Sequence, residues 1–193
     1  MAKLFFKYST MNAGKSIDLI RINHNYIENG KKTICLTPEI DNRYGVGKIT
    51  SRIGISIDAI PIKPDMNIFR LVSGFDDKIS CVFVDEVQFI SKEQIYQLSD
   101  IVDFLDIPVI CYGLRTDFQL KEFPTSSYLF SIADSVIELK TICSQCKEKK
   151  ATVNARFYEG KITVTGNKVQ IGDTEYKPMC RHCYKQLLNK EKI

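Results

Sequence analysis

The chain has 193 residues, of which 44% are hydrophobic, so it has enough apolar side chains for a core. No apolar run approaches the roughly 20 residues of a membrane span, and the N-terminus does not resemble a signal peptide. We therefore expect a cytoplasmic protein with no membrane partner. The formal net charge of +4 is mild, and we interpret it as a solvated surface, so no nucleic-acid partner is expected.

Hydrophobic periodicity predicts strands that alternate with helices along the first 140 residues. Strands are expected at 2–8, 32–36, 81–86, 107–114 and 135–139, and helices at 15–29, near 65–73 and at 92–105. Ser91 followed by Gln94 is a capping box that opens the last helix. Residues 41–54 are rich in glycine and basic residues and are interpreted as a loop. This alternation predicts a mainly parallel sheet with helices on both faces.

The first phosphate-binding candidate is STMNAGKS, residues 9–16. Gly14, Lys15 and Ser16 match the end of the pattern G-x-x-x-x-G-K-[ST], whereas Ser9 replaces its first glycine. An apolar strand precedes this stretch and an amphipathic helix follows it, which directs backbone N–H groups towards a phosphate. Lys15 is expected to reach the outer phosphates and Ser16 to ligate Mg²⁺.

A pair of carboxylates follows the apolar strand within VFVDEVQF, residues 82–89. Ligands of open α/β sheets bind at the carboxyl ends of strands, so both carboxylates are candidate site residues. Asp85 is expected to support Mg²⁺, and Glu86 to act as the general base towards a hydroxyl acceptor. Asp-Glu-x-Gln also occurs in nucleic-acid-driven ATPases, but those usually need two motor domains. A small-molecule kinase fits the length better.

The sequence changes character near residue 140, so we predict a P-loop domain over 1–140 and a zinc-binding domain over 141–193. Four of the seven cysteines form the pairs CSQC and CRHC, namely Cys143, Cys146, Cys180 and Cys183. Such a quartet favours a structural zinc ion, although a redox role and ligation by His182 are alternatives. Between the pairs, RFYEGKITV predicts a hairpin that turns at Glu159-Gly160. The 33-residue excursion between the pairs is expected to close over a substrate.

These motifs, in their order and spacing, resemble the thymidine kinases that combine a P-loop with a zinc-bearing lasso. The resemblance runs nearly end to end, and it rests on STMNAGKS, PEIDNRYG, VFVDEVQF, CYGLRTDF and the two cysteine pairs. It implies a P-loop NTPase-like (RecA-like) fold and phosphoryl transfer from ATP to the 5′-hydroxyl of thymidine, with Glu86 as the base. It also implies Mg²⁺ with ATP, a homotetramer and feedback inhibition by dTTP.

The resemblance assigns two further sets of site residues. The implied ATP and Mg²⁺ contacts are Ser9, Thr10, Met11, Asn12, Ala13, Gly14, Lys15, Ser16, Asp41, Arg43, Asp85, Glu86, Val87 and Gln88. The implied thymidine contacts are Met11, Phe89, Leu114, Phe118, Phe123, Lys168, Val169, Gln170, Ile171, Gly172 and Tyr176. Without the resemblance, most of the aromatic residues in this second set would be interpreted as residues of the hydrophobic core.

Three other interpretations remain open from the residues. One is a nucleic-acid-stimulated ATPase in which the cysteine pairs form a zinc ribbon. Another is an interaction module that binds nucleotide without turnover. The third keeps the kinase but changes the acceptor to deoxyuridine or deoxycytidine.

Overall fold

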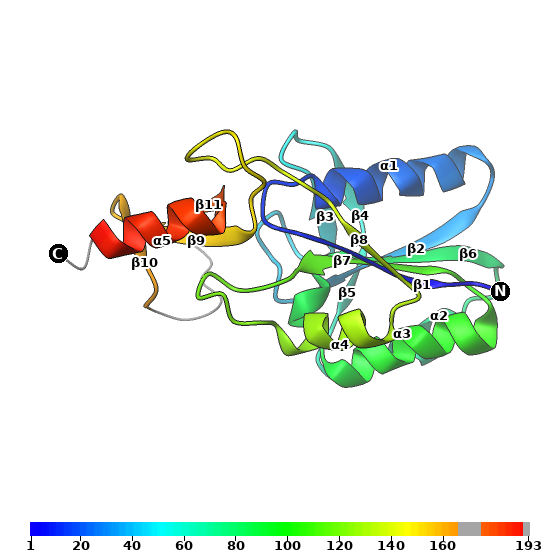
Figure 1. Ribbon diagram of the computed structural model, residues 1–193. Helices are drawn as coiled ribbons and strands as arrows, with labels where there is room; N and C mark the ends of the chain where they lie inside the picture. The colour runs from blue at the N-terminus through cyan, green and yellow to red at the C-terminus, as the bar shows by residue number, and fades with distance from the viewer. Residues whose placement is uncertain (166–174, 191–193) are drawn as a thin grey trace.

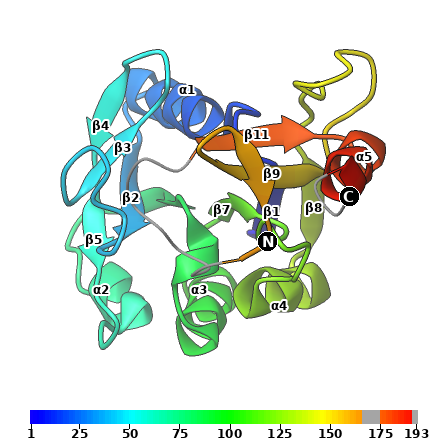
Figure 2. The same ribbon diagram turned by 90° about the vertical axis from the view of Figure 1, so that its left-hand side faces the viewer.

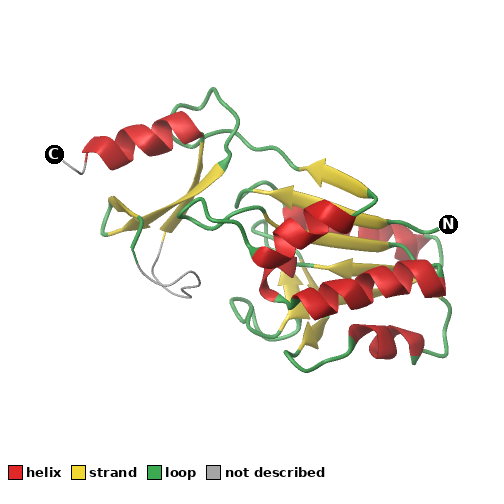
Figure 3. Ribbon diagram, turned by 60° about the horizontal axis from the view of Figure 1, so that its bottom comes forward, coloured by secondary structure: helices red, strands yellow, loops and turns green. Residues whose placement is uncertain are grey.

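The computed structural model describes residues 1–165 and 175–190, which form a larger α/β lobe and a smaller C-terminal lobe (Figures 1 and 3). The larger lobe is built on a six-stranded sheet with the strand order β5-β2-β6-β7-β1-β8. All neighbouring strands in it run parallel. The strands are β1 (Leu4–Ser9), β2 (Lys32–Pro38), β5 (Ile60–Ile62), β6 (Ile79–Val84), β7 (Val109–Leu114) and β8 (Ser135–Glu138).

Helices cover both faces of this sheet, as Figures 1 and 2 show. One face carries α1 (Lys15–Glu28), and the other carries α2 (Ile68–Ser73), α3 (Lys92–Leu105) and α4 (Pro124–Ile132). Successive residues of β6 point to opposite faces, so Val82 packs on the side of α3 while Phe83 packs on the side of α1. Both are fully buried, as expected for a parallel strand covered on each side. The predicted fold class is confirmed.

The predicted elements recur with shifted ends. Ser91 and Gln94 form the expected capping box of α3. The strand predicted at 81–86 ends at Val84, so Asp85 and Glu86 lie just beyond its carboxyl end. The stretch 41–54 is not wholly loop, because it contains β3 (Lys48–Thr50), which pairs antiparallel with β4 (Ser56–Asp58).

The smaller lobe is a three-stranded antiparallel sheet with one helix. Its elements are β9 (Val153–Tyr158), β10 (Lys161–Thr163), β11 (Glu175–Met179) and α5 (Arg181–Lys190). The predicted hairpin is confirmed: Tyr158 pairs with Lys161, and both turn residues, Glu159 and Gly160, have positive φ. This lobe has an apolar cluster of its own, in which the cysteine pairs take part.

Polar contacts join the two lobes. The backbone N–H of Met11 donates to Asn154 Oδ1 at 2.7 Å, and the Tyr184 hydroxyl donates to the carbonyl of Phe118 at 2.8 Å. These contacts place β9 and α5 over the carboxyl edge of the parallel sheet. Among the described helices, none is both long and apolar enough to traverse a bilayer.

Candidate active site

The loop between β1 and α1 has the backbone of a phosphate-binding loop. Asn12 and Gly14 have positive φ, and α1 begins directly after Gly14. A Cβ on Gly14 would lie 3.2 Å from Ile17 Cγ2, so glycine suits this position for two reasons. Ser9 is the last residue of β1 and is not among the residues with positive φ. The backbone at this position therefore does not require glycine.

Lys15 is buried within this loop. Its Nζ donates to Ser9 Oγ at 3.1 Å and to the carbonyl of Thr10 at 3.2 Å. Burial lowers the pKa of Lys15, and the carboxylates of Glu86 and Asp85 oppose that shift. Ser9 thus contributes an oxygen acceptor for the lysine that the usual glycine would lack. A phosphate arriving in the loop would offer the ammonium group stronger acceptors.

Asp85 connects β6 to the phosphate loop. Its Oδ2 accepts a 2.9 Å hydrogen bond from the Ser16 hydroxyl, and its Oδ1 accepts the backbone N–H of Glu86 at 3.0 Å. Burial raises the pKa of Asp85 to about 7, and the neighbouring Glu86 charge acts in the same direction. A hydroxyl beside a carboxylate is the oxygen donor set that Mg²⁺ prefers, so the predicted pair fits that ion.

Glu86 has an unusual backbone and a strongly polar environment. Its φ of 47° lies in the left-handed region, which is uncommon for a residue other than glycine. Its Oε1 accepts from Arg43 Nη2 at 2.7 Å, and its Oε2 accepts from Gln88 Nε2 at 2.5 Å. Burial alone would raise the pKa of Glu86, but Arg43, Lys15 and Gln88 together lower it. Glu86 is therefore held as a carboxylate beside a pocket.

Asp41 orients the arginine that contacts Glu86. Arg43 donates to Asp41 from Nε at 2.6 Å and from Nη2 at 2.9 Å, while the same Nη2 reaches Glu86. Both residues follow β2, so the carboxyl ends of β2 and β6 bring three predicted site residues together.

Gln88 and Val87 lie beneath the site and do not line either pocket described below. Val87 is fully buried in the apolar core, within the single turn of 3-10 helix η1 (Val87–Phe89). Gln88 is also buried: its Nε2 holds Glu86, and its Oε1 accepts the backbone N–H of Leu114 at 3.0 Å. Both residues thus lie beneath the two pockets, and their expected ligand contacts stay predictions.

A first pocket lies between the lobes and is mostly apolar. Six of the thymidine contacts that the family resemblance implies line this pocket, namely Met11, Phe89, Leu114, Phe118, Phe123 and Tyr176. The phosphate-site residues Asp41, Arg43 and Glu86 line it as well. Ile40, Thr116, Asp117 and Asn154 complete the described wall and were not predicted. The expected contacts Lys168, Val169, Gln170, Ile171 and Gly172 fall outside the described residues.

A second pocket lies over the phosphate loop. Its wall contains residues 11–17 of the loop and of α1, together with Arg43, Tyr44 and Glu86. Thr50 at the end of β3 and residues 51–53 of the turn that follows it close its other side and were not among the predicted contacts. Met11, Arg43 and Glu86 line both pockets, so the two sites meet at these three side chains.

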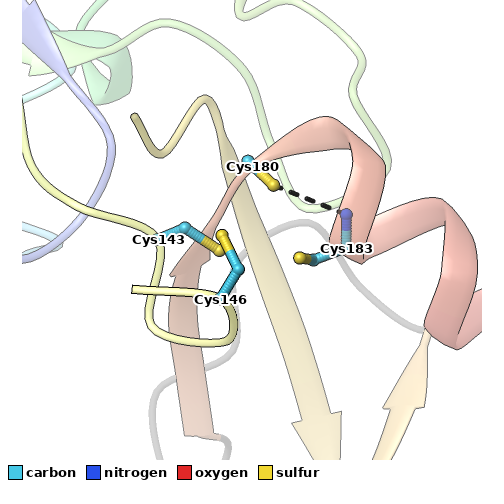
Figure 4. A group of neighbouring side chains, drawn as sticks. All are labelled: Cys143, Cys146, Cys180 and Cys183. Carbon is cyan, nitrogen blue, oxygen red and sulfur yellow. Dashed lines mark hydrogen bonds between the residues drawn. The ribbon is translucent and has the colours of Figure 1, made fainter. Parts of the chain in front are cut away.

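The four paired cysteines come together where the loop before β9 meets the start of α5 (Figure 4). Their Sγ atoms all lie within 4.8 Å of one another, and three of the four side chains are buried. Tetrahedral thiolate ligation at about 2.3 Å needs sulfurs roughly 3.8 Å apart, so the cluster fits a structural metal ion. Burial opposes ionisation of Cys143, but backbone N–H donors from Cys180 and Cys146 outweigh it and lower its pKa to about 6. His182 is exposed and is not part of this set.

Comparison with known proteins agrees with this geometry. The thymidine kinase family model matches residues 2–184. A thymidine kinase of Haemophilus influenzae is 50% identical over 189 residues, covering 96% of this chain and 97% of that relative. Thymidine kinases of Lactiplantibacillus plantarum and Streptococcus pyogenes are 47% and 45% identical, each over 95% of this chain and at least 96% of the relative. The chain therefore belongs to the thymidine kinase family.

Proposed function

We propose that this chain is a thymidine kinase that transfers the γ-phosphoryl group of ATP to the 5′-hydroxyl of thymidine, yielding dTMP for DNA synthesis. The observation that carries the proposal is the position of Glu86, on the wall shared by the phosphate-loop pocket and the aromatic pocket. A base at this junction can reach the hydroxyl of a nucleoside in one pocket while the donor phosphates occupy the other.

In this proposal the donor phosphates bind along residues 9–16, and Lys15 turns from Ser9 and Thr10 to the outer phosphates. Ser16 and Asp85 would hold Mg²⁺, which would neutralise phosphate charge. Glu86 accepts the proton of the 5′-hydroxyl, and Arg43 stabilises the charge that develops on the transferred group. The thymine ring lies among Phe89, Phe118, Phe123 and Tyr176.

The remaining assignments follow from family membership and from the chemistry of the thiol cluster. We assign Zn²⁺ as the ion of the four cysteines, because a closed quartet of thiolates is its usual structural site. Residues 1–140 and 141–193 are assigned as two domains of a cytoplasmic homotetramer that dTTP inhibits and that has no nucleic-acid partner.

The test is ADP release by the purified protein with Mg-ATP, in the presence and absence of each deoxynucleoside. We expect release that requires thymidine and that is matched by an equal amount of dTMP. ADP release that ignores nucleosides and rises with single-stranded nucleic acid would contradict the proposal and favour an ATPase. Preference for deoxyuridine or deoxycytidine would change the acceptor but retain the kinase.

A further inference from the structure

The turn between β3 and β4 brings an arginine to the phosphate-loop pocket. Arg52 lines this pocket together with Lys15 and Arg43, although it lies far from Lys15 along the chain. Its charge also acts on Lys15, where it contributes to lowering the lysine pKa. The pocket therefore contains three cationic side chains from three separate segments, of which only Lys15 belongs to a recognised phosphate-binding motif.

The backbone around Arg52 is fixed by local hydrogen bonds. The Ser51 N–H donates to the carbonyl of Ile55 at 2.8 Å, and the Gly54 N–H donates to the carbonyl of Ser51 at 3.0 Å. The Ser51 hydroxyl adds a bond of 3.0 Å to the Ile55 carbonyl and accepts the Ile55 N–H at 3.2 Å. Ser51 is buried, whereas Arg52 is exposed. The turn thus fixes the backbone at Arg52 and leaves its side chain exposed.

The charge of Arg52 has no acidic partner within the described residues. Arg43, by contrast, is engaged by Asp41 and Glu86. A guanidinium group presents five N–H donors in a planar fork that matches phosphate oxygens, and it is more weakly hydrated than an ammonium group. An uncompensated guanidinium that lines a pocket with Lys15 is suited to a ligand with several negative charges.

We propose that Arg52 is a phosphate-binding residue of the donor site, which contacts the outer phosphates of the nucleoside triphosphate from the side opposite the phosphate loop. The inference rests on the proposed function for the identity of the donor. It makes the β3–β4 hairpin a part of the donor site.

The matched test uses Arg52→Gln, Arg52→Lys and the control Lys48→Gln. Lys48 lies on the same hairpin and carries the same charge, but it is 4.0 Å from Asp58 and is not part of the pocket wall. The first measurement is the affinity of each variant for fluorescent MANT-ATP and MANT-AMP. A lost charge-assisted contact weakens MANT-ATP binding by about 10-fold to 100-fold in Arg52→Gln, with a smaller effect on MANT-AMP. The affinity of Arg52→Lys for MANT-ATP is expected to lie between that of Arg52→Gln and that of the wild type.

The second measurement is steady-state kinetics, in which the KM for ATP is expected to rise with little change in the KM for thymidine. Unchanged MANT-ATP affinity in Arg52→Gln would overturn the proposal, and so would an equal loss in Lys48→Gln, which would indicate long-range charge alone. The nucleotide-binding measurement does not depend on thymidine turnover. A protein that binds MANT-ATP through Arg52 but phosphorylates no nucleoside would refute only the proposed function.

Discussion

Asp85 and Glu86 are adjacent carboxylates with opposite titration behaviour. Asp85 is buried against Ser16, and its pKa is raised to about 7, whereas Glu86 is held ionised by Arg43, Lys15 and Gln88. The two carboxylates are therefore suited to different tasks. Glu86 is ionised near neutral pH and can accept a proton, whereas Asp85 loses its proton most readily when a bound cation stabilises the carboxylate.

Glu86→Gln is predicted to lower turnover by roughly 10²-fold to 10⁴-fold, because an amide cannot take up the proton of the thymidine 5′-hydroxyl. The fold should persist, since glutamine has nearly the same shape and retains an oxygen acceptor for Arg43. The comparison is kcat with thymidine against MANT-ATP affinity, with Glu93→Gln on the exposed start of α3 as the control. Near-normal turnover in Glu86→Gln would remove this residue from its role.

Asp85→Asn is predicted to stabilise the metal-free protein at alkaline pH while abolishing turnover. The folded pKa of about 7 lies above the ordinary value of 3.8, so ionised Asp85 destabilises the fold above neutral pH. The gain should be on the order of 4 kcal/mol at pH 8, it should shrink as the pH falls from about 7 to about 4, and it should disappear below about pH 4, where the aspartic acid is protonated in both states.

Urea unfolding of wild type and Asp85→Asn across this pH range, in Mg²⁺-free buffer, measures that difference. Asp76→Asn is the control, because Asp76 is exposed and surface changes usually stay within about 0.5 kcal/mol. A stability difference that did not change with pH would show that burial does not perturb Asp85.

At the scale of elements, the site depends on how closely η1 approaches the end of β7. Gln88 links Glu86 to the backbone of Leu114, and the Thr125 hydroxyl of α4 donates to the Gln88 carbonyl at 3.0 Å. A Cβ on Gly113 would lie 2.8 Å from Val87 Cγ1 and 2.9 Å from Gln88 Oε1. Only glycine allows this approach, so Gly113 supports the position of Glu86 through Gln88.

Gly113→Ala is predicted to destabilise the fold by about 1–3 kcal/mol through overpacking and to lower kcat by displacing Gln88. Gly30→Ala is the comparison, since Gly30 has a positive φ but nothing within 4 Å of an added Cβ. That variant should lose about 1 kcal/mol of stability through backbone strain and keep its activity. Equal kcat in the two variants would contradict a supporting role for Gly113.

The elements predicted correctly are those with strong local signals. The apolar runs of β6 and β7 and the capping box of α3 are legible in the sequence because burial and capping select particular residues there. The helix α4 was missed because its N-cap position, Phe123, provides no side-chain cap. Ser126, inside α4, is buried and bonds the Leu114 carbonyl, a tertiary contact without a local pattern.

The parts of the candidate site that could be predicted are those encoded in contiguous motifs. The phosphate loop and the carboxylate pair are such motifs, and the structure brings their residues together. Asn154 and Arg52 reach the two pockets through packing of segments distant in sequence, which no spacing rule encodes. The pocket residues Phe118 and Tyr176 were predicted through family resemblance, because hydrophobic periodicity alone does not distinguish a side chain in a pocket wall from one in the core.

At the scale of the whole molecule, the two lobes together form the aromatic pocket. The larger lobe contributes Phe89 and Phe118, and the smaller lobe contributes Asn154 and Tyr176. The phosphate-loop pocket, by contrast, is lined within the described residues by the larger lobe alone. Loss of order in the smaller lobe should therefore affect the two pockets differently.

Removal of the metal ion is predicted to raise the KM for thymidine by about tenfold or more, equivalent to at least about 1.4 kcal/mol of binding, and to leave MANT-ATP affinity within about twofold. Without an ion, the clustered thiolates repel one another and cannot fix the loop before β9 to the start of α5.

The treatments that test this prediction are a zinc chelator and Cys146→Ser, with Cys35→Ala as a control cysteine from the core of the larger lobe. Metal content is followed alongside, and readdition of Zn²⁺ should restore the chelated wild type but not Cys146→Ser. Parallel loss of thymidine and ATP binding would show that the lobes fold as one unit, whereas loss of thymidine binding alone would establish that the cysteine cluster serves the acceptor side.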